Sequence, residues 1–407
     1  MSVPHSSSFI SINDVIDREK CSLTYVRIDD AIQTLQTLGR GSWMCKADIT
    51  DAFKLIPVKP SQWCLQGVKH LNQYFFFTRL VFGCRSSPKL FNDLASILCW
   101  IAKNNYGIDH FCNPLDDYLA IDSPDADADR TMALFTLIFA KLNIPLSHHK
   151  TVGPTHVLEY LGIVLDSNKM EASLPKQKID RIIGIIRQFL HLKKCTKREI
   201  LSSLRNLNFA SRMIVQGITF VSFLLLLAKS VKELYHYMYL DVECRLELEI
   251  WYSFLQEWNG ISFFRLNKHT FAADFELYTD ASSMHGFGAY FQGKWFAGKW
   301  PEGIFIHDNE SSMAFLELYP IVAAAVLWSH NWTSRKIIFN CDNQATVAII
   351  NKGRSKSPLI MRLMRRLTLC AMTYCYVVTA RYLPGVKNGI ADSLSRFQWN
   401  RFHQLAP

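Results

Sequence analysis

The stretch Asn113-Pro114-Leu115-Asp116-Asp117-Tyr118-Leu119 places two adjacent carboxylates between apolar residues, and the interpretation of the whole chain starts from it. Burying such a pair is costly unless a cation neutralises it. We expect Asp116 and Asp117 at the tight turn of a β-hairpin, with Leu115 and residues 118–121 in the flanking strands. A solvated turn is the alternative, because aspartate is common in turns. The neighbouring segments favour the first interpretation.

The composition is that of a globular protein with an excess of basic residues. With 407 residues the chain is long enough for two or three domains. Hydrophobic residues make up 49% and charged residues 20%, which argues against general disorder. The formal net charge of +10 favours a polyanionic partner.

Nothing in the sequence predicts secretion or membrane insertion. The Ser-rich N-terminus lacks a basic region followed by an apolar one. The longest apolar run, residues 218–228, is much shorter than the roughly 20 residues of a membrane span and predicts a buried helix. Eleven cysteines without a CxxC pair indicate reduced thiols, not a disulfide framework or a zinc site. We therefore expect an intracellular protein of the cytoplasm or nucleus that is not secreted and has no membrane partner.

The first part of the chain predicts alternating strands and helices. In order, these are a helix at 29–38, a strand at 44–49, a strand at 74–78, a helix at 89–102, the acidic hairpin and a helix at 129–142. This order predicts a split βαβ arrangement, in which the strand that carries Asp48 lies beside the hairpin. A helix cap is the alternative role for Asp48.

Three carboxylates would then share one location. They repel one another unless divalent cations bind between them, and an all-oxygen ligand set suits Mg²⁺. Two such ions can activate a primer 3′-hydroxyl and neutralise a triphosphate during in-line displacement. This is the chemistry of a nucleic-acid polymerase.

Four segments resemble, in the same order, the palm motifs of reverse transcriptases, especially those of DIRS-like retrotransposons, which encode a tyrosine recombinase. The segments are Ala47-Asp48-Ile49-Thr50-Asp51-Ala52-Phe53, Leu80-Val81-Phe82-Gly83-Cys84-Arg85-Ser86-Ser87-Pro88, Leu115-Asp116-Asp117 and Glu159-Tyr160-Leu161-Gly162. The resemblance implies a site with two Mg²⁺, or Mn²⁺, held by Asp48, Asp116, Asp117 and the carbonyl of Ile49.

The same resemblance implies roles for further residues. Phe53 would exclude ribonucleotides, with core packing as the alternative. Gly83 would lie against the incoming deoxynucleoside triphosphate and the template. Lys150 would protonate the pyrophosphate leaving group, with a plain surface lysine as the alternative. The segment Tyr160-Leu161-Gly162 would grip the primer.

The resemblance also implies a domain organisation. Residues 1–40 would be a partial fingers remnant, residues 41–166 the palm, and residues 167–265 a helical thumb or connection. The basic cluster at 193–198 would hold the backbone of the template and primer, although a solvated helix face is the alternative.

The last part of the chain predicts strands, then helices and strands in alternation. Strands are expected at 275–282, 286–291, 294–298, 336–343 and 376–382, and helices at 312–328 and 345–350, around Arg362, Arg365 and Arg366, and from 388 onwards. The acids Asp280, Glu317, Asp342 and Asp392 resemble the ribonuclease H quartet on a βββαβαβα fold, here at residues 270–400. Such acids can hold two Mg²⁺ ions that position a water against an RNA phosphodiester.

The sequence therefore predicts a multidomain α+β and α/β protein with a palm, a helical thumb and a ribonuclease H-like domain. The predicted function is RNA-directed DNA polymerase with ribonuclease H activity, acting on an RNA template, a DNA primer and an RNA/DNA hybrid. Two alternatives are ribonuclease H activity alone, because the fingers are expected to be truncated, and an inactive or domesticated nucleic-acid-binding relic. Binding by such a relic would weaken with salt but would not require Mg²⁺.

Overall fold

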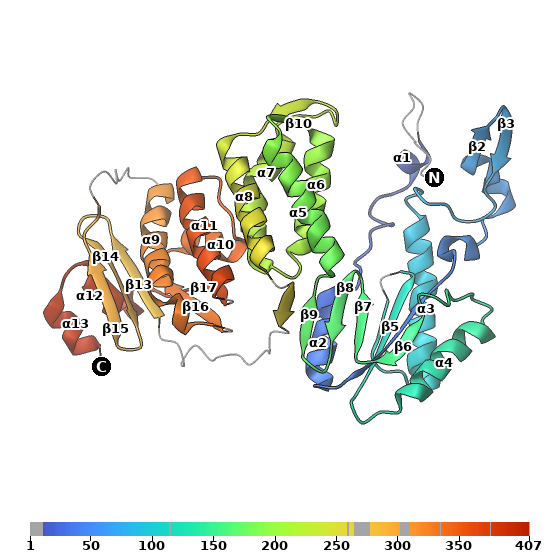
Figure 1. The fold of residues 1–407 in the computed structure, drawn as a ribbon, viewed down its shortest axis with the longest axis horizontal. Helices are drawn as coiled ribbons and strands as arrows, with labels where there is room; N and C mark the ends of the chain where they lie inside the picture. The colour runs from blue at the N-terminus through green and yellow to red at the C-terminus, as the bar shows by residue number, and fades with distance from the viewer. Residues whose placement is uncertain are drawn as a thin grey trace. The chain divides into compact units, whose positions relative to one another are not determined.

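The computed structural model describes residues 11–113, 115–258, 260–263, 277–301, 310–333, 335–374 and 376–406. The chain divides into two compact units. The first comprises Met1–Pro175 with Ile261–Phe264, and the second comprises Lys176–Gly260 with Arg265–Pro407. Each unit contains both helices and strands, so the protein is a multidomain mixed α/β fold (Figure 1).

The first unit is built on a four-stranded sheet in the order β4-β5-β1-β6. Its strands are β1 (Trp43–Asp48), β4 (Phe111–Cys112), β5 (Asp117–Asp122) and β6 (Val152–Thr155). Strand β1 runs antiparallel to β5 over its full length, and this register puts Asp48 opposite Asp117. The expected neighbourhood of the Asp48 strand and the acidic hairpin is therefore confirmed.

Helices α3 (Ser87–Tyr106) and α4 (Ala128–Lys141) cover one face of this sheet. Phe91 on α3 and Phe135 on α4 share a buried cluster with Ala47 and Tyr118 of the sheet. Alternate strand residues point to opposite faces, so the intervening Leu119 is buried on the other side. Helix α2 (Ile28–Leu38) packs against β5.

The acidic hairpin differs from the prediction at Leu115. This residue was expected in a strand, but it lies in the turn between β4 and β5 with a positive φ of 70°. The left-handed conformation is unusual for a residue with a branched side chain. The tight reversal of the chain at this position requires the left-handed conformation of Leu115. Strand β5 then begins at Asp117.

The remaining elements of the first unit are a second sheet, a hairpin and short helices. The second sheet has the order β12-β9-β8-β7 and comprises β7 (Val157–Tyr160), β8 (Ile163–Asp166), β9 (Glu171–Ser173) and β12 (Ile261–Phe263). The other elements are α1 (Ile12–Val15), η1 (Ala52–Leu55), η2 (Pro60–Gln66), β2 (Gly67–His70) and β3 (Gln73–Phe76). Because β12 follows the helices of the second unit in sequence, the chain returns to the first unit before it leaves it again. The expected change from helices to strands at 265–271 lies outside the described residues.

The second unit begins with a group of helices. They are α5 (Lys176–His191), α6 (Lys197–Ala210), η3 (Val215–Val221), α7 (Ser222–Lys229) and α8 (Val242–Glu257). The apolar run 218–228 was expected to form one buried helix, but the chain changes from the 3₁₀ helix η3 to α7 after Val221. A short two-stranded antiparallel sheet of β10 (Lys194–Thr196) and β11 (Tyr237–Tyr239) was not predicted. It lies at one end of these helices (Figure 1).

A five-stranded sheet in the order β15-β14-β13-β16-β17 follows. Its strands are β13 (Leu277–Ser282), β14 (Gly286–Phe291), β15 (Lys294–Gly298), β16 (Lys336–Cys341) and β17 (Val377–Tyr382). Strands β13, β14 and β15 pair antiparallel, whereas β16 runs parallel to both β13 and β17.

The helices of this part are α9 (Glu310–Trp328), η5 (Ser329–Asn331), α10 (Gln344–Lys352), α11 (Pro358–Thr373), η6 (Gly385–Lys387), α12 (Gly389–Ser395) and α13 (Trp399–Leu405). The described strands and helices follow the expected βββαβαβα order, with two added helices. Both α10 and α11 separate β16 from β17, and α13 follows α12. The short loop between α10 and α11 contains Gly353 with a φ of 67°, which ends α10 and starts a new helix direction.

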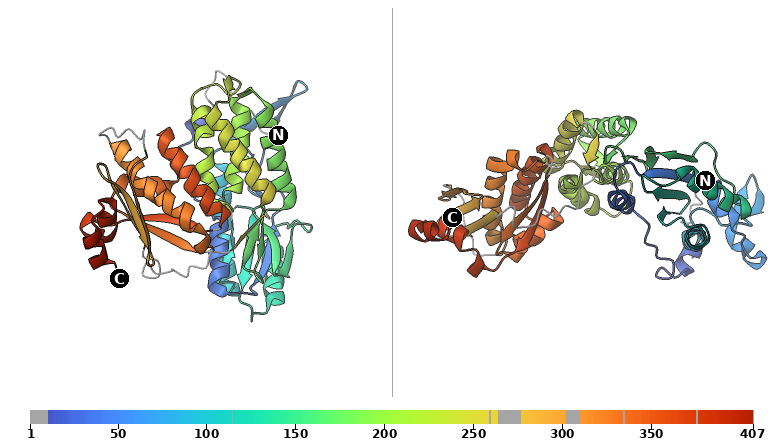
Figure 2. Two further views of the ribbon diagram at one scale, coloured as in Figure 1. Left: turned by 60° about the vertical axis from the view of Figure 1, so that its left-hand side comes forward. Right: turned by 90° about the horizontal axis from the view of Figure 1, so that it is seen from below.

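Helices cover both faces of the five-stranded sheet (Figure 2). Phe291 belongs to the large cluster with α9 and α11, whereas the preceding residue, Tyr290, packs with Leu394 and Phe402 of α12 and α13. Residues 313–331 are long and apolar enough to cross a membrane by length and composition. However, 61% of an 18-residue stretch of this segment is buried inside the protein. Packing in a core explains this apolar character.

A buried ion pair joins the helices to this sheet domain within the second unit. Arg365 on α11 reaches Glu243 and Glu247 on α8, with 3.4 Å between Nη2 of Arg365 and Oε1 of Glu247. The same Glu247 carboxylate accepts hydrogen bonds from the backbone N–H groups of Phe223 and Leu224, at the start of α7. The two parts of the unit are therefore held together by a polar contact as well as by packing.

Candidate active sites

The first acidic site lies at the end of the central sheet in the first unit. Asp48 ends β1 and is buried, with 7% of its surface exposed. Asp117 begins β5 opposite it, and Asp116 immediately precedes Asp117. The N–H of Ile49 donates a hydrogen bond of 3.2 Å to the carbonyl of Asp116, which ties the strand end to the acidic turn. Three carboxylates from segments almost 70 residues apart thus share one location.

Two lysines face these carboxylates. Nζ of Lys150 lies 3.1 Å from Oδ1 and 3.2 Å from Oδ2 of Asp48, and Nζ of Lys46 lies 3.4 Å from Oδ1 of Asp117. Burial, together with the charges of Asp117 and Asp48, raises the pKa of Asp116. The hydrogen bond to Asp48 raises the pKa of Lys150, which therefore stays protonated at neutral pH. The sequence prediction missed Lys46, although it precedes Asp48 by two residues on the same strand and so lies on the same face.

A pocket of about 390 Å³ adjoins this site. It is lined by Lys46, Asp117, His149, Lys150, Val152, Leu158, Glu159, Leu161 and Gly162. Leu161 and Gly162 form the β7–β8 turn with φ of 48° and 81°, so the turn predicted to grip the primer does lie beside Asp117. The side chain of Tyr160 is fully buried and supports the turn from inside.

Phe53 and Gly83 lie on neighbouring segments of the first unit. Phe53 is on η1, with its ring 4.8 Å from the ring of Phe82 and 5.7 Å from that of Phe91, so it packs at the edge of the core. Gly83 has a φ of 94°, and its carbonyl accepts a hydrogen bond of 2.8 Å from Nδ2 of Asn13. Neither residue lines the pocket beside Asp117.

The second acidic site lies in the sheet domain of the second unit. Asp280 is on β13, Glu317 on α9, Asp342 directly after β16 and Asp392 on α12. Their charges act on one another: those of Asp342 and Asp392 raise the pKa of Asp280, and those of Asp280 and Asp342 raise the pKa of Glu317. Four acids spread over more than 110 residues of sequence are therefore gathered at one point.

Burial dominates the protonation of three of these acids. It raises the pKa of Asp280 to about 6 and that of Glu317 well above its ordinary value. It also raises the pKa of Asp342. A site that buries carboxylates without enough local positive charge holds protons more tightly, and a cation would displace them.

Asp392 differs from the other three. Burial acts to raise its pKa, but hydrogen bonds from Arg396 and Arg401 outweigh burial and lower it. Nε of Arg396 lies 2.7 Å from Oδ1 of Asp392, and Nη1 of Arg401 lies 2.6 Å from Oδ2. Ser395 donates a hydrogen bond of 2.5 Å to Oδ2 of Asp280. The prediction missed these partners, although Ser395 and Arg396 follow Asp392 by three and four residues and so share its helix face.

Cys341 is a further residue of the second site that the prediction missed. One ligand atom each from Glu317, Cys341 and Asp342 lies within 4.8 Å of the others, and the three are buried or half-buried. The sequence offered only the position of Cys341 directly before Asp342.

Both acidic sites fit a divalent cation by their donor atoms. The first offers carboxylate oxygens from Asp48, Asp116 and Asp117, and the second offers those of four acids with the thiol of Cys341 beside them. Hard oxygen ligands of this kind suit Mg²⁺ or Mn²⁺. Burial is the main cause of the raised pKa of Asp116 and of Asp280, and the charges of neighbouring acids add to it.

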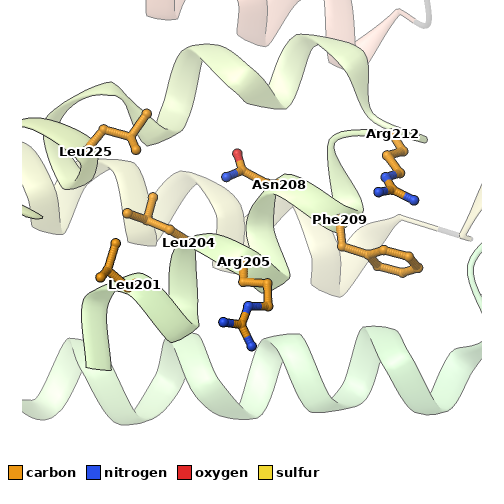
Figure 3. A pocket seen from close by; sticks show the side chains of 7 residues that line it. All are labelled: Leu201, Leu204, Arg205, Asn208, Phe209, Arg212 and Leu225. Carbon is orange, nitrogen blue, oxygen red and sulfur yellow. The ribbon is translucent and has the colours of Figure 1, made fainter. Parts of the chain in front are cut away.

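A third concave surface lies among the helices of the second unit. A pocket of about 400 Å³ is lined by Leu201, Leu204, Arg205, Asn208, Phe209, Arg212 and Leu225. Figure 3 shows the three leucines gathered at one end, Phe209 and Arg212 at the other, and Arg205 and Asn208 between them. Arg212 and Lys178 both lie over the Phe209 ring, at 5.5 and 5.4 Å from its centre. With cations and apolar groups but no acid in its lining, this pocket is suited to binding and not to metal-dependent chemistry.

No protein-family model matches the chain, and no curated protein matches it. Among solved structures, it is similar to a foamy viral protease-reverse transcriptase dRH in complex with double-stranded DNA, with a TM-score of 0.48 and 15% identity over 89% of this chain and 60% of that one. A foamy viral protease-reverse transcriptase in complex with an RNA/DNA hybrid gives a TM-score of 0.45 and 15% identity over 86% of this chain and 45% of that one. The chain thus spans less than two thirds of the length of either. TM-scores below 0.5 leave the function to be argued from the side chains of this chain.

Proposed function

We propose that the protein carries two phosphoryl-transfer sites, an RNA-directed DNA polymerase site in the first unit and a ribonuclease H site in the second. The observation that carries the proposal is the convergence of carboxylates. In each unit separately, acids from distant segments meet at one location, three in the first and four in the second. Acids that lie this close together favour a bound cation, and the same kind of arrangement occurs separately in both units.

In the polymerase site Asp48, Asp116 and Asp117 would hold Mg²⁺, with the carbonyl of Ile49 as a further ligand. When bound, two such ions activate a 3′-hydroxyl and neutralise a triphosphate. The ammonium of Lys150 keeps its proton at neutral pH and would give it to the pyrophosphate that departs. Lys46 fixes the orientation of Asp117, and the turn at Leu161 and Gly162 would hold the primer beside them.

Two further residues would select the nucleotide. Phe53 would exclude a ribonucleotide by the bulk of its ring, so that deoxynucleoside triphosphates are the substrates. Its contacts with Phe82 and Phe91 hold the ring in place for this role. Gly83 would lie against the nucleotide and template.

In the ribonuclease H site Asp280, Glu317, Asp342 and Asp392 would hold the cations, and the RNA strand of an RNA/DNA hybrid would be cut to leave a 3′-hydroxyl. Bound Mg²⁺ would supply a polarised water. Ser395 and Asn388 orient the carboxylate of Asp280, with hydrogen bonds of 2.5 and 3.5 Å. Arg396 and Arg401 keep Asp392 ionised and fix its position.

The test uses the full chain with Mg²⁺, a labelled RNA template and an annealed DNA primer, and it resolves extension and RNA cleavage on one gel. Asp116→Asn is expected to abolish extension and to leave cleavage of a preformed hybrid intact. Asp342→Asn is expected to do the opposite. Retention of both activities by both variants would show that the two sites are wrongly assigned. Binding without turnover in the wild-type chain, unaffected by removal of Mg²⁺, would identify a non-catalytic relic.

A further inference from the structure

The two-stranded sheet of β10 and β11 presents tyrosines on an exposed surface. Tyr235, Tyr237 and Tyr239 expose 67%, 61% and 76% of their surface. Met238, between the last two, exposes only 5% of its surface, and Cys195 opposite it is completely buried. Because strand side chains alternate, Tyr237 and Tyr239 point to the same, outward face. We call this two-stranded sheet together with Tyr235 the tyrosine ribbon.

Cations accompany the rings of the tyrosine ribbon. Nζ of Lys194 lies 5.0 Å from the centre of the Tyr237 ring, and the guanidinium of Arg198 lies 5.6 Å from that of Tyr235. Arg198 also donates a hydrogen bond of 2.8 Å to the hydroxyl of Tyr235. Lys194 lies directly opposite Tyr239 in the register of the two strands, so the lysine side chain is also on the outward face. The arrangement holds the rings in place and puts positive charge beside them.

Two acids near the tyrosine ribbon accept hydrogen bonds at the starts of helices. Glu199 accepts hydrogen bonds from Thr196 in a capping box at the start of α6, and Asp241 accepts one from the N–H of Cys244 at the start of α8. Across residues 193–239, which include both strands, the chain has eight lysines and arginines against two acids, Glu199 and Glu233. The surface is therefore complementary to a polyanion.

We infer that the tyrosine ribbon binds unpaired nucleotides of single-stranded nucleic acid. Bases stack on exposed aromatic rings whatever their sequence, and cations beside the rings hold the phosphates. Tyr237 and Tyr239 are two residues apart, about 7 Å along the strand, so each ring can accept a separate base. A base-paired duplex hides its base faces in its own stack, so the ribbon favours unpaired over paired strands. This binding does not depend on either proposed active site.

The test compares Tyr237→Leu/Tyr239→Leu with the matched control Tyr237→Phe/Tyr239→Phe in the full chain. The affinity for a fluorescent 20-nucleotide oligothymidine and for a 20-base-pair duplex is measured by anisotropy in EDTA, so that neither active site can contribute turnover. Loss of one stacked base lowers affinity about 5- to 140-fold. We expect the leucine variant to bind the single strand at least about fivefold more weakly, and the phenylalanine variant to bind as the wild type does.

Two further readouts separate stacking from other roles. The slope of log affinity against log salt should be the same in wild type and leucine variant, because the lysines and arginines are retained. Equal thermal midpoints would show that the exposed substitutions leave the fold intact.

Three outcomes would overturn the inference. The first is a loss of single-strand affinity below fivefold in the leucine variant. The second is an equal loss of duplex affinity in that variant. The third is a phenylalanine variant that binds the single strand as weakly as the leucine variant does. A change from dimer to monomer in sedimentation without loss of oligonucleotide affinity would assign the ribbon to self-association instead. Because extension and cleavage are measured separately with Mg²⁺, failure of the proposed enzyme activities would leave this result unaffected.

Discussion

The ammonium of Lys150 lies within 3.2 Å of both carboxylate oxygens of Asp48, although the two residues are 102 positions apart in the sequence. The contact depends on the segment before β6, where the N–H of Ser147 donates to the carbonyl of Asp48. That backbone hydrogen bond of 2.8 Å holds the segment that contains Lys150 against the end of β1. The protonated ammonium of Lys150 is thereby held at the acidic cluster of the first unit.

Replacement of Lys150 by Gln tests the role of this proton. General acid catalysis contributes typically 10²- to 10⁴-fold, so we expect the rate of DNA extension to fall by about 10²-fold or more. Cleavage of a preformed RNA/DNA hybrid should be unchanged, because the second site is separate. The measurement is the single-turnover rate of primer extension. Lys169→Gln, an exposed lysine of the same unit, is the control and should leave extension unchanged. A Lys150→Gln enzyme with the wild-type rate would make the residue a plain surface lysine.

The stability of the metal-free protein should depend on pH through the second acidic site. The folded pKa of Asp280 is raised to about 6, so its contribution to stability is present in full below the unfolded pKa and is lost as the pH rises through about 6. Glu317 and Glu247, whose pKa values burial also raises, act in the same direction. We expect the thermal midpoint in EDTA to be lower at pH 7.5 than at pH 5, and Asp280→Asn to reduce the difference. Asp180→Asn, on the exposed side of α5, should leave it unchanged.

Cys341 should make the second site sensitive to softer metals. Zn²⁺ accepts thiolate ligands that Mg²⁺ does not, and the thiol lies within 4.8 Å of ligand atoms of Glu317 and Asp342. We expect Zn²⁺ to inhibit Mg²⁺-supported hybrid cleavage, and the half-inhibiting concentration to rise by about tenfold in Cys341→Ala. Each protein is compared with its own rate in Mg²⁺ alone. The same Zn²⁺ sensitivity in both proteins would exclude the thiol as a ligand.

Arg365 should be important for the stability of the second unit. It is 8% exposed by its side chain and pairs with Glu247, which is fully buried. Removing one partner of a buried ion pair leaves an uncompensated charge and typically costs about 3–5 kcal/mol. We expect Arg365→Leu to lower the free energy of unfolding by this amount, measured by urea denaturation. Arg366→Leu, exposed on the same helix, should change it by less than about 0.5 kcal/mol. Addition of Glu247→Leu to Arg365→Leu should recover part of the loss, and no recovery would contradict the pairing.

The sequence patterns located most of the elements because their signals are local. The apolar spacing of residues 29–38 and the Gly39 that follows predict a helix, and the structure places α2 at Ile28–Leu38 with Gly39 as its cap. The alternation in 286–291 and 294–298 predicts the hairpin that β14 and β15 form. The prediction missed the two-stranded sheet of β10 and β11 because no local signal marks it. Its strands are three residues each and more than 40 residues apart, so no local period marks them.

What the sequence by itself determined is that each acid lies in or directly beside a strand, a turn or a helix, since such an element is readable from the few residues around it. Only the tertiary structure decided what surrounds each acid. Lys150 at Asp48, Arg401 at Asp392, Cys341 beside Glu317 and the pair of Arg365 with Glu247 all join side chains by contacts that a linear pattern does not encode. The physical reason is that burial and the charges nearby set the pKa of an acid and its capacity to hold a cation. Both of these depend on which distant segments the fold packs against it.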